Sequence, residues 1–291
     1  MQKLLFICSV ILLSVVWVGW GLKKEKYAVT SLETAIACLP METKELYKEE
    51  ASMAAFASLH PSPRKANQDR RLGKMIKFKA ADGQEANAYF IASKKKSKKW
   101  LIVIQEWWGL NDNIKSEADK YYKDLTDMNI LAVDMYDGKV ATTPDSAMKI
   151  MRGANMNRMS SIIAGAIGHA GPKASIYSVG WCFGGMWSLQ TAILAGSQGK
   201  GSVMFYGRPE NDLEKLKKIQ CDVIGFFGNK DQSPSPAMVN EFGKNMEAAG
   251  KKLTKYNYEA GHGFANPSNP NFNAEATADS YAKAIAFLKA H

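Results

Sequence analysis

Cysteine and histidine are scarce in this chain. There are four residues of each type among 291, and no C-x-x-C motif is present. So few cysteines do not make a disulfide scaffold. Without a C-x-x-C motif, a thiol redox sensor built on Cys182 and Cys221 is also disfavoured. No internal repeat is visible, which argues against a repeat architecture.

The composition is that of an ordinary globular protein. Hydrophobic residues make up 46% of the chain, charged residues 23% and aromatic residues 10%, which excludes wholesale disorder. The formal net charge of +10 could indicate an anionic partner. However, five lysines are concentrated in residues 94–99, between two expected strands, and no aromatic residues are interleaved with them. This run predicts a solvated turn, and we expect no nucleic-acid partner.

Residues 4–22 form a long run without a charged side chain. Such a run at a chain start is typical of a secretory signal or a membrane anchor, whereas a buried helix of a soluble domain would carry a polar face. Trp17 and Trp20 favour a retained anchor, and the small-residue cleavage sites at residues 35–37 and 55–57 lie far downstream. Lysines just after the run oppose export of the downstream chain. We nevertheless expect an exported protein of the periplasm or cell envelope, with membrane association through residues 4–22.

The chain thus divides into a signal peptide or membrane anchor, residues 1–22, an accessory segment with a linker, residues 23–72, and one domain, residues 73–291. The accessory segment is too small and polar to hold a core alone. Asp82-Gly83 predicts an antiparallel hairpin at the start of the domain. Short apolar runs then alternate with helical stretches, as in a mostly parallel sheet with helices on both faces. The expected strands are 101–105, 130–134, 175–180, 201–207, 222–228 and 253–259, and the expected helices lie near 113–128, within 144–170, after the Gly-rich turn at 180–185, near 236–249 and near 274–289.

The Gly-rich turn reads G-W-C-F-G-G over residues 180–185 and follows an expected strand. This is the G-x-nucleophile-x-G pattern, with Cys182 in the position of the nucleophile. Glycines are required because a strand that turns sharply into a helix leaves no room for side chains beside the nucleophile. The turn places Cys182 at a helix N-terminus, which favours a thiolate and an oxyanion. The alternative is a buried structural cysteine among small residues.

An acid and a histidine are expected downstream, each on a loop after a strand. Asp231 follows the strand at 222–228, and His262 follows the strand at 253–259. The other histidines lie in the linker, near a helix end and at the terminus, so His262 is the plausible base. Asp222 and Glu259 are weaker alternatives to Asp231. The competing interpretation is that His262 and Asp231 are ordinary turn residues.

The loop after the strand at 101–105 reads Q-E-W-W-G. In a fold of this kind that loop supplies one backbone donor of the oxyanion hole, and the residue after the nucleophile supplies the other. The expected donors are therefore the N–H groups of Trp107 and Phe183.

These motifs together resemble the dienelactone hydrolase family, the cysteine branch of the α/β-hydrolases. The resemblance covers residues 73–291 and rests on Q-E-W-W-G, the G-W-C-F-G-G turn, G-N-K-D and G-H-G-F-A-N. It implies that Cys182 is the nucleophile, His262 the base and Asp231 its orienting acid. It also implies that Glu106 pairs with the cysteine in the resting enzyme and helps to deprotonate it when substrate binds.

The sequence departs from the family at the residues that bind substrate. The family's dienelactone enzymes hold a substrate carboxylate with two arginines, one shortly after D-x-Y and one after G-H-x-F-A. Here the corresponding stretches contain Lys139 and Asn266 instead, so dienelactone itself is a doubtful substrate. We expect Tyr136, Trp108 and Lys139 to contact the substrate, with aromatic side chains forming an apolar pocket.

The sequence thus predicts an α/β-hydrolase that cleaves esters or lactones through a Cys-Asp-His triad and an acyl-enzyme thioester, without metal or cofactor. Its partner is a small-molecule ester or lactone. Two alternatives stay open: a hydrolase of the same fold directed at peptides, and a catalytically silent envelope protein that binds a ligand in the same cleft.

Overall fold

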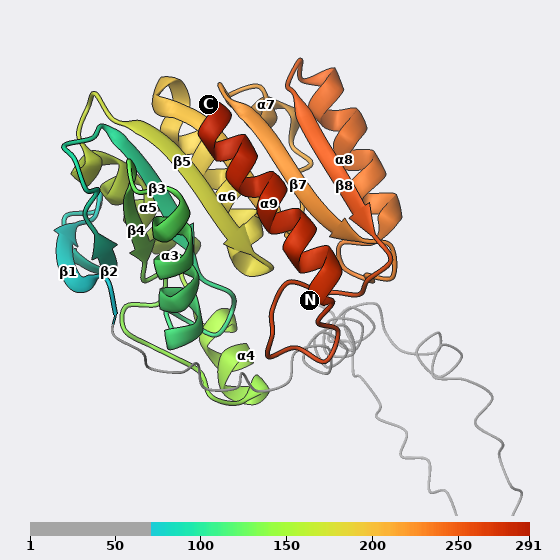
Figure 1. Cartoon of the computed structure of the whole chain (residues 1–291), viewed down its shortest axis with the longest axis horizontal. Coiled ribbons are helices and arrows are strands. Elements are labelled where there is room, and N and C mark those ends of the chain that lie inside the picture. The colour runs from blue at the N-terminus through green and yellow to red at the C-terminus, as the bar shows by residue number, and fades with distance from the viewer. Residues whose placement is uncertain (1–70) are drawn as a thin grey trace, which may run out of the picture. The chain divides into compact units, whose positions relative to one another are not determined.

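The computed structural model describes residues 71–291 (Figure 1). The expected signal or anchor at residues 4–22 and nearly all of the accessory segment lie outside the described residues. Within residues 71–291, no helix has the length and apolar character needed to cross a membrane.

The centre of the described part is an eight-stranded sheet in the order β1-β2-β4-β3-β5-β6-β7-β8. The β1–β2 and β2–β4 pairs are antiparallel, and the other neighbours are parallel. This confirms the predicted mostly parallel sheet that an antiparallel hairpin opens. The strands are β1 (Lys74–Lys79), β2 (Glu85–Ile91), β3 (Lys99–Ile104), β4 (Asn129–Val133), β5 (Ser175–Trp181), β6 (Gly199–Phe205), β7 (Asp222–Gly228) and β8 (Leu253–Tyr258).

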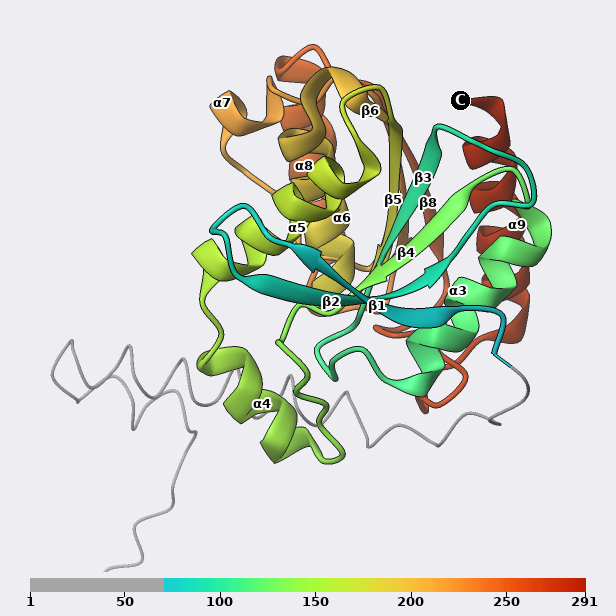
Figure 2. The same ribbon diagram turned by 90° about the vertical axis from the view of Figure 1, so that its left-hand side faces the viewer.

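Helices cover both faces of the sheet, as expected. Figure 2 shows α3 and α9 on one side and α5, α6 and α8 on the other. Buried strands supply apolar side chains to both faces: in β3, Leu101 and Val103 join the cluster under α3 and α9, whereas Ile102 and Ile104 join the cluster under α5. The helices are α3 (Asp112–Asp124), α4 (Pro144–Arg152), α5 (Met156–Ala170), α6 (Phe183–Ala195), the short η1 (Gly196–Gln198), α7 (Leu213–Leu216), α8 (Pro236–Ala248) and α9 (Ala274–Ala290).

The hairpin and the lysine run are confirmed. Gly83 takes a positive φ of 83° in the turn between β1 and β2, and the Asp82 side chain accepts from the Gln84 N–H. The lysines at 94, 95, 96 and 98 are exposed in the loop between β2 and β3.

The expected helix at 113–128 is too long. The helix α3 ends at Asp124, and the N–H of Leu125 closes its last turn. A turn at residues 126–127 then leads into β4 at Asn129. The helix stops because the chain must reverse there to place the fully buried β4 beside β3.

Candidate active site

Cys182 lies between β5 and α6, at the carboxyl end of a central strand. Its backbone has φ 55° and ψ −117°, a conformation that L-residues rarely adopt. Such strain costs about 1–3 kcal/mol and persists only where the surroundings enforce it. This is the sharp strand-to-helix turn that the sequence predicts, and it places Cys182 at the N-terminus of α6.

Two glycines make the turn possible through close backbone approach. A Cβ atom at Gly180 would lie 2.1 Å from the Gly184 oxygen, and one at Gly184 would lie 2.3 Å from the Ile104 oxygen. Any side chain at these positions would collide with backbone. The second contact also shows that the first turn of α6 packs directly against the end of β3.

The structure brings Cys182, His262 and Asp231 together. His262 Nδ1 lies 2.7 Å from Asp231 Oδ2, and the other Asp231 oxygen accepts from the Ser233 N–H at 2.8 Å. His262 also lies close enough to Cys182 for the charge of the cysteine to act on its imidazole. The three residues are each 5% exposed or less. They come from the loops after β5, β7 and β8, as expected.

The electrostatics of His262 follow from these contacts. Burial alone would lower the pKa of the imidazole, but the charge of Cys182 and the hydrogen bond to Asp231 outweigh it and raise that pKa to about 10. The site therefore favours the protonated form of His262.

Glu106 lies beside this group, in the loop after β3. It is 7% exposed, and its Oε2 accepts from Asn266 Nδ2 at 2.7 Å. Burial raises the pKa of Glu106 to about 7, although the neighbouring His262, Asn266 and Tyr206 all act to lower it. Asn266 thus occupies the position at which the family resemblance implies an arginine, and its amide donates to this carboxyl group.

The two expected oxyanion donors belong to segments in direct contact. Phe183 is the first residue of α6, where helix amides have no intrahelical acceptor. Trp107 is fully buried in the neighbouring loop, where Gly109 donates back to the Glu106 carbonyl at 3.3 Å. The geometry places both backbones near the carboxyl end of β3 and the Cys182 turn.

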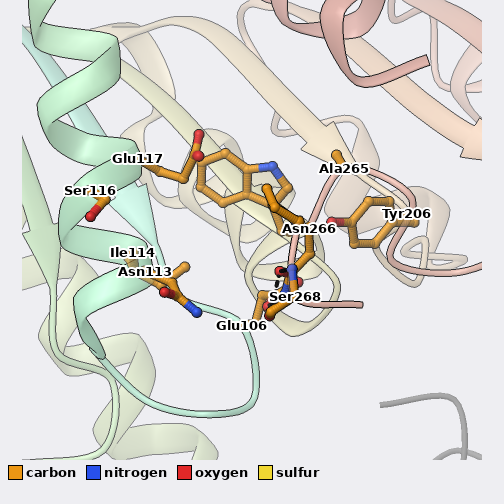
Figure 3. Close-up of a pocket in the computed structure, with 11 residues that line it drawn as sticks. Glu106, Asn113, Ile114, Ser116, Glu117, Tyr206, Ala265, Asn266 and Ser268 are labelled. Carbon is orange, nitrogen blue, oxygen red and sulfur yellow. Dashed lines mark hydrogen bonds between the residues drawn. The ribbon is translucent and has the colours of Figure 1, made fainter. Parts of the chain in front are cut away.

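A cavity of about 280 Å³ opens next to Glu106. Figure 3 shows Asn113 and Glu117 on the α3 side of the cavity, opposite Tyr206, Ala265 and Asn266, whereas the Ser116 hydroxyl points away from it and accepts from Arg71. Ile114, Trp181, Pro267 and Ser268 complete the lining with Glu106.

The expected substrate-binding residues do not line this cavity. Trp108 is 2% exposed and packs against Trp107, with ring centroids 4.9 Å apart. Tyr136 is buried against Phe183, close enough to Cys182 that burial and then the charge of the cysteine raise the pKa of its hydroxyl. Lys139 is exposed on the loop after β4. Among the described residues, no group of three His, Cys, Asp or Glu side chains is arranged to hold a metal ion.

Tyr206 and Glu117 also line the cavity, and neither was predicted from the sequence as a site residue. Tyr206 is fully buried directly after β6, with a positive φ of 36°, and its ring lies 5.1 Å from that of His262. Its place at the end of the strand next to β5 could have indicated a site residue. No sequence signal separates Glu117 from an ordinary surface charge on α3.

Comparisons with known proteins agree with this architecture. The family model described as the dienelactone hydrolase family matches residues 86–291. Protein usf of Aquifex pyrophilus is 28% identical over 232 residues, which span 75% of this chain and 98% of that protein. Carboxymethylenebutenolidase 1 of Cupriavidus pinatubonensis is 23% identical, over 73% of this chain and 95% of its own length.

A solved structure shares the fold. A dienelactone hydrolase-like promiscuous phosphotriesterase from metagenomic libraries superposes with a TM-score of 0.63 at 22% identity, covering 75% of this chain and 98% of that one. The family match takes in the turn at Cys182 and the loops that carry Asp231 and His262. The chain is a hydrolase that belongs to the dienelactone hydrolase family.

Proposed function

We propose that the protein hydrolyses carboxylic esters or lactones with Cys182 as nucleophile. The observation that carries this proposal is the buried chain of contacts from Cys182 through His262 to Asp231, set at a strained turn on a helix N-terminus. A nucleophile bonded to a base that an acid orients is the arrangement used for covalent acyl transfer.

The reaction follows from the positions of these groups. The Cys182 thiolate attacks the ester carbonyl carbon, a C–S bond forms, and the carbonyl electron pair moves onto oxygen. The N–H groups of Phe183 and Trp107 stabilise that oxyanion, and each such donor is worth about 3 kcal/mol. The tetrahedral intermediate collapses with cleavage of the C–O bond, and the alcohol leaves with the proton of the His262 imidazolium.

Water completes the cycle. His262, now neutral and held by Asp231, takes a proton from a water molecule as the oxygen attacks the thioester carbonyl. The second tetrahedral intermediate releases the carboxylic acid and restores the Cys182 thiolate and the imidazolium. In a lactone the alcohol and the acid are parts of one product.

Glu106 is suited to adjust the resting state of this site. Its carboxyl group titrates near neutral pH because burial raises its pKa to about 7, and it lies close enough to His262 for the two charges to interact. We propose that Glu106 pairs with the cysteine before substrate arrives and helps to deprotonate it on binding, as the family resemblance implies.

Matched nitrophenyl esters and nitroanilides of the same acyl group test the proposal against the peptide-directed alternative. We expect hydrolysis of the esters, and loss of at least about a thousandfold in kcat/KM in Cys182→Ala. Cys221→Ala is the control, because burial raises the pKa of Cys221 to about 11 and leaves that thiol unreactive. Ester hydrolysis that survives Cys182→Ala would favour a catalytically silent binding protein, and faster cleavage of the anilides would favour a peptidase.

A further inference from the structure

The cavity beside Glu106 is acidic, although the whole chain carries a net charge of +10. Among the described residues that line it, Glu106 and Glu117 are the two with carboxyl groups, and none is a lysine, arginine or histidine. The other polar side chains of this lining are uncharged amides and hydroxyls such as those of Asn113 and Ser116. The ionisable groups of the lining are therefore opposite in sign to the net charge of the molecule, although His262 lies beside Glu106.

Glu117 contributes a carboxylate on the α3 side of the cavity. It pairs with Lys120, 4.0 Å away on the next turn of α3, and the Lys120 side chain is 44% exposed. The Lys120 ammonium also lies 3.7 Å from the centroid of the Tyr281 ring, outside the cavity lining. The Glu117 side chain is 29% exposed, and burial raises its pKa while the charge of Lys120 lowers it. A cation bound in the cavity would therefore favour the charged form of Glu117.

Two aromatic rings line the cavity together with the two carboxyl groups. Trp181 and Tyr206 both line the cavity, and each is held by other rings: Trp181 stacks on Phe205 with centroids 5.6 Å apart, and Tyr206 meets Phe264 edge-on at 5.3 Å. The face of an aromatic ring attracts a cation, and tryptophan does so best. Rigid aromatic rings beside a carboxylate can bind an alkylammonium group, because both attract its positive charge.

Two residues of the cavity lining adjoin the groups of the expected triad. Trp181 immediately precedes Cys182, and Glu106 both lines the cavity and lies near His262. A volume of about 280 Å³ is just below the usual range of small-molecule pockets and suits a small group rather than a long chain.

We propose that this cavity binds a positively charged alkylammonium group of the ester substrate, with Glu117 and Trp181 as the residues that determine the preference. The inference rests on the proposed ester hydrolysis and specifies its substrate class. A carboxylate-bearing substrate would meet like charge in the same place.

Three acetate esters of similar shape test the preference: acetylcholine, its uncharged isostere with tert-butyl in place of trimethylammonium, and a sulfonate-bearing analogue. With the full-length chain we expect kcat/KM for the cationic ester to exceed that for the neutral one by about tenfold, with the anionic ester slowest. In Glu117→Gln the cationic-to-neutral ratio should fall toward one. In Glu214→Gln, a control whose side chain is 78% exposed on α7, the ratio should not change.

A binding measurement keeps this test separate from the test of hydrolysis. Calorimetric titration of full-length Cys182→Ala with acetylcholine and with the neutral isostere measures the preference without turnover. Tighter binding of acetylcholine, weakened by adding Glu117→Gln, supports the proposal even if no ester is hydrolysed, in which case the proposed function fails alone. Equal binding and equal kcat/KM for the two esters would overturn the charge preference while ester hydrolysis could still stand.

Discussion

His262 is the residue on which the charge of the site depends. It lies between Cys182 and Asp231, and these two neighbours together outweigh the burial that would otherwise lower its pKa. Tyr206 packs edge-on against the ring and fixes its plane. The orientation and charge of one imidazole are thus set by a cysteine on one side and a carboxylate on the other.

Replacing Asp231 by asparagine should therefore slow ester hydrolysis by roughly a thousandfold or more. Asparagine keeps the shape but removes the negative charge from His262 Nδ1, so the pKa of His262 should fall from about 10. The measurement is the pH profile of kcat/KM on a nitrophenyl ester. Asp222→Asn is the matched control, because Asp222 is bonded to Lys252 and His291 instead; an equal loss in both variants would contradict the assignment.

The raised pKa of Glu106 predicts that the stability of the folded protein depends on pH. Burial raises its pKa from the ordinary value of 4.5 to about 7 in the folded protein, so the fold favours the protonated carboxyl group. The folded protein then binds more protons than the unfolded chain between these values, and stability falls as pH rises from about 4.5 to about 7. The shift corresponds to about 3 kcal/mol at most.

The Glu106→Gln variant should not show this fall in stability as the pH rises. Urea unfolding at pH 5 and pH 8 would give the difference in unfolding free energy for each protein, with Glu214→Gln as a control on an exposed side chain. If parent and Glu106→Gln change equally between the two pH values, burial does not raise the pKa of Glu106.

At the scale of elements, the site depends on how tightly α6 approaches β3. Gly184 lies in the first turn of α6, and there a Cβ atom would be 2.3 Å from the Ile104 oxygen and 2.4 Å from the Gln105 oxygen. Both oxygens belong to the segment that leads into the loop with Glu106 and Trp107. The same contact therefore positions the proposed nucleophile, Cys182, and the expected oxyanion donor.

Gly184→Ala should destabilise the fold by about 1–3 kcal/mol and reduce kcat more than KM changes, because α6 must move away from the loop. Gly168→Ala is the contrasting variant: Gly168 is in α5, and a Cβ atom there would meet none of the described residues within 4 Å. That change should stabilise the helix by roughly 0.5–1 kcal/mol. Thermal unfolding and ester kinetics check both, and a harmless Gly184→Ala would show that the close approach is dispensable.

The elements that the sequence predicts well are those that local physics determines. Asp82-Gly83 specifies the hairpin, apolar runs specify the buried strands, and the glycines around Cys182 allow a single tight geometry. Glu117 and Tyr206 escaped prediction because tertiary packing alone decides which side of α3 faces the cavity and how the chain leaves β6. The exposed Lys139 does not line the cavity. Its position could not be predicted because the path of a loop depends on tertiary contacts and not on the loop sequence alone.

At the scale of the whole molecule, the family match begins at residue 86 and reaches residue 291. The residues of the site lie within that span. Upstream of it, the Arg71 side chain donates to Ser116 and pairs with Asp119, both on α3. The expected site residues thus lie in the C-terminal three quarters of the chain. We propose that residues 4–22 serve export or anchoring instead.

A chain that begins at Arg71 should therefore retain the kcat/KM of the full chain on a nitrophenyl ester but change its location. We expect the full-length chain in the periplasmic or membrane fraction of cells and the shortened chain in the cytosolic fraction. Activity measured in each fraction is the readout. A full-length chain found with cytosolic markers would contradict export, and an inactive but folded short chain would give residues 1–70 a part in catalysis.

Mass spectrometry of the protein during turnover of a slowly hydrolysed nitrophenyl ester tests the central claim most directly. The account predicts one acyl group per chain, located by peptide mapping on Cys182, and its accumulation when His262→Ala slows thioester hydrolysis. Ester hydrolysis without an acyl group on Cys182, or with the acyl group on another residue, would contradict it.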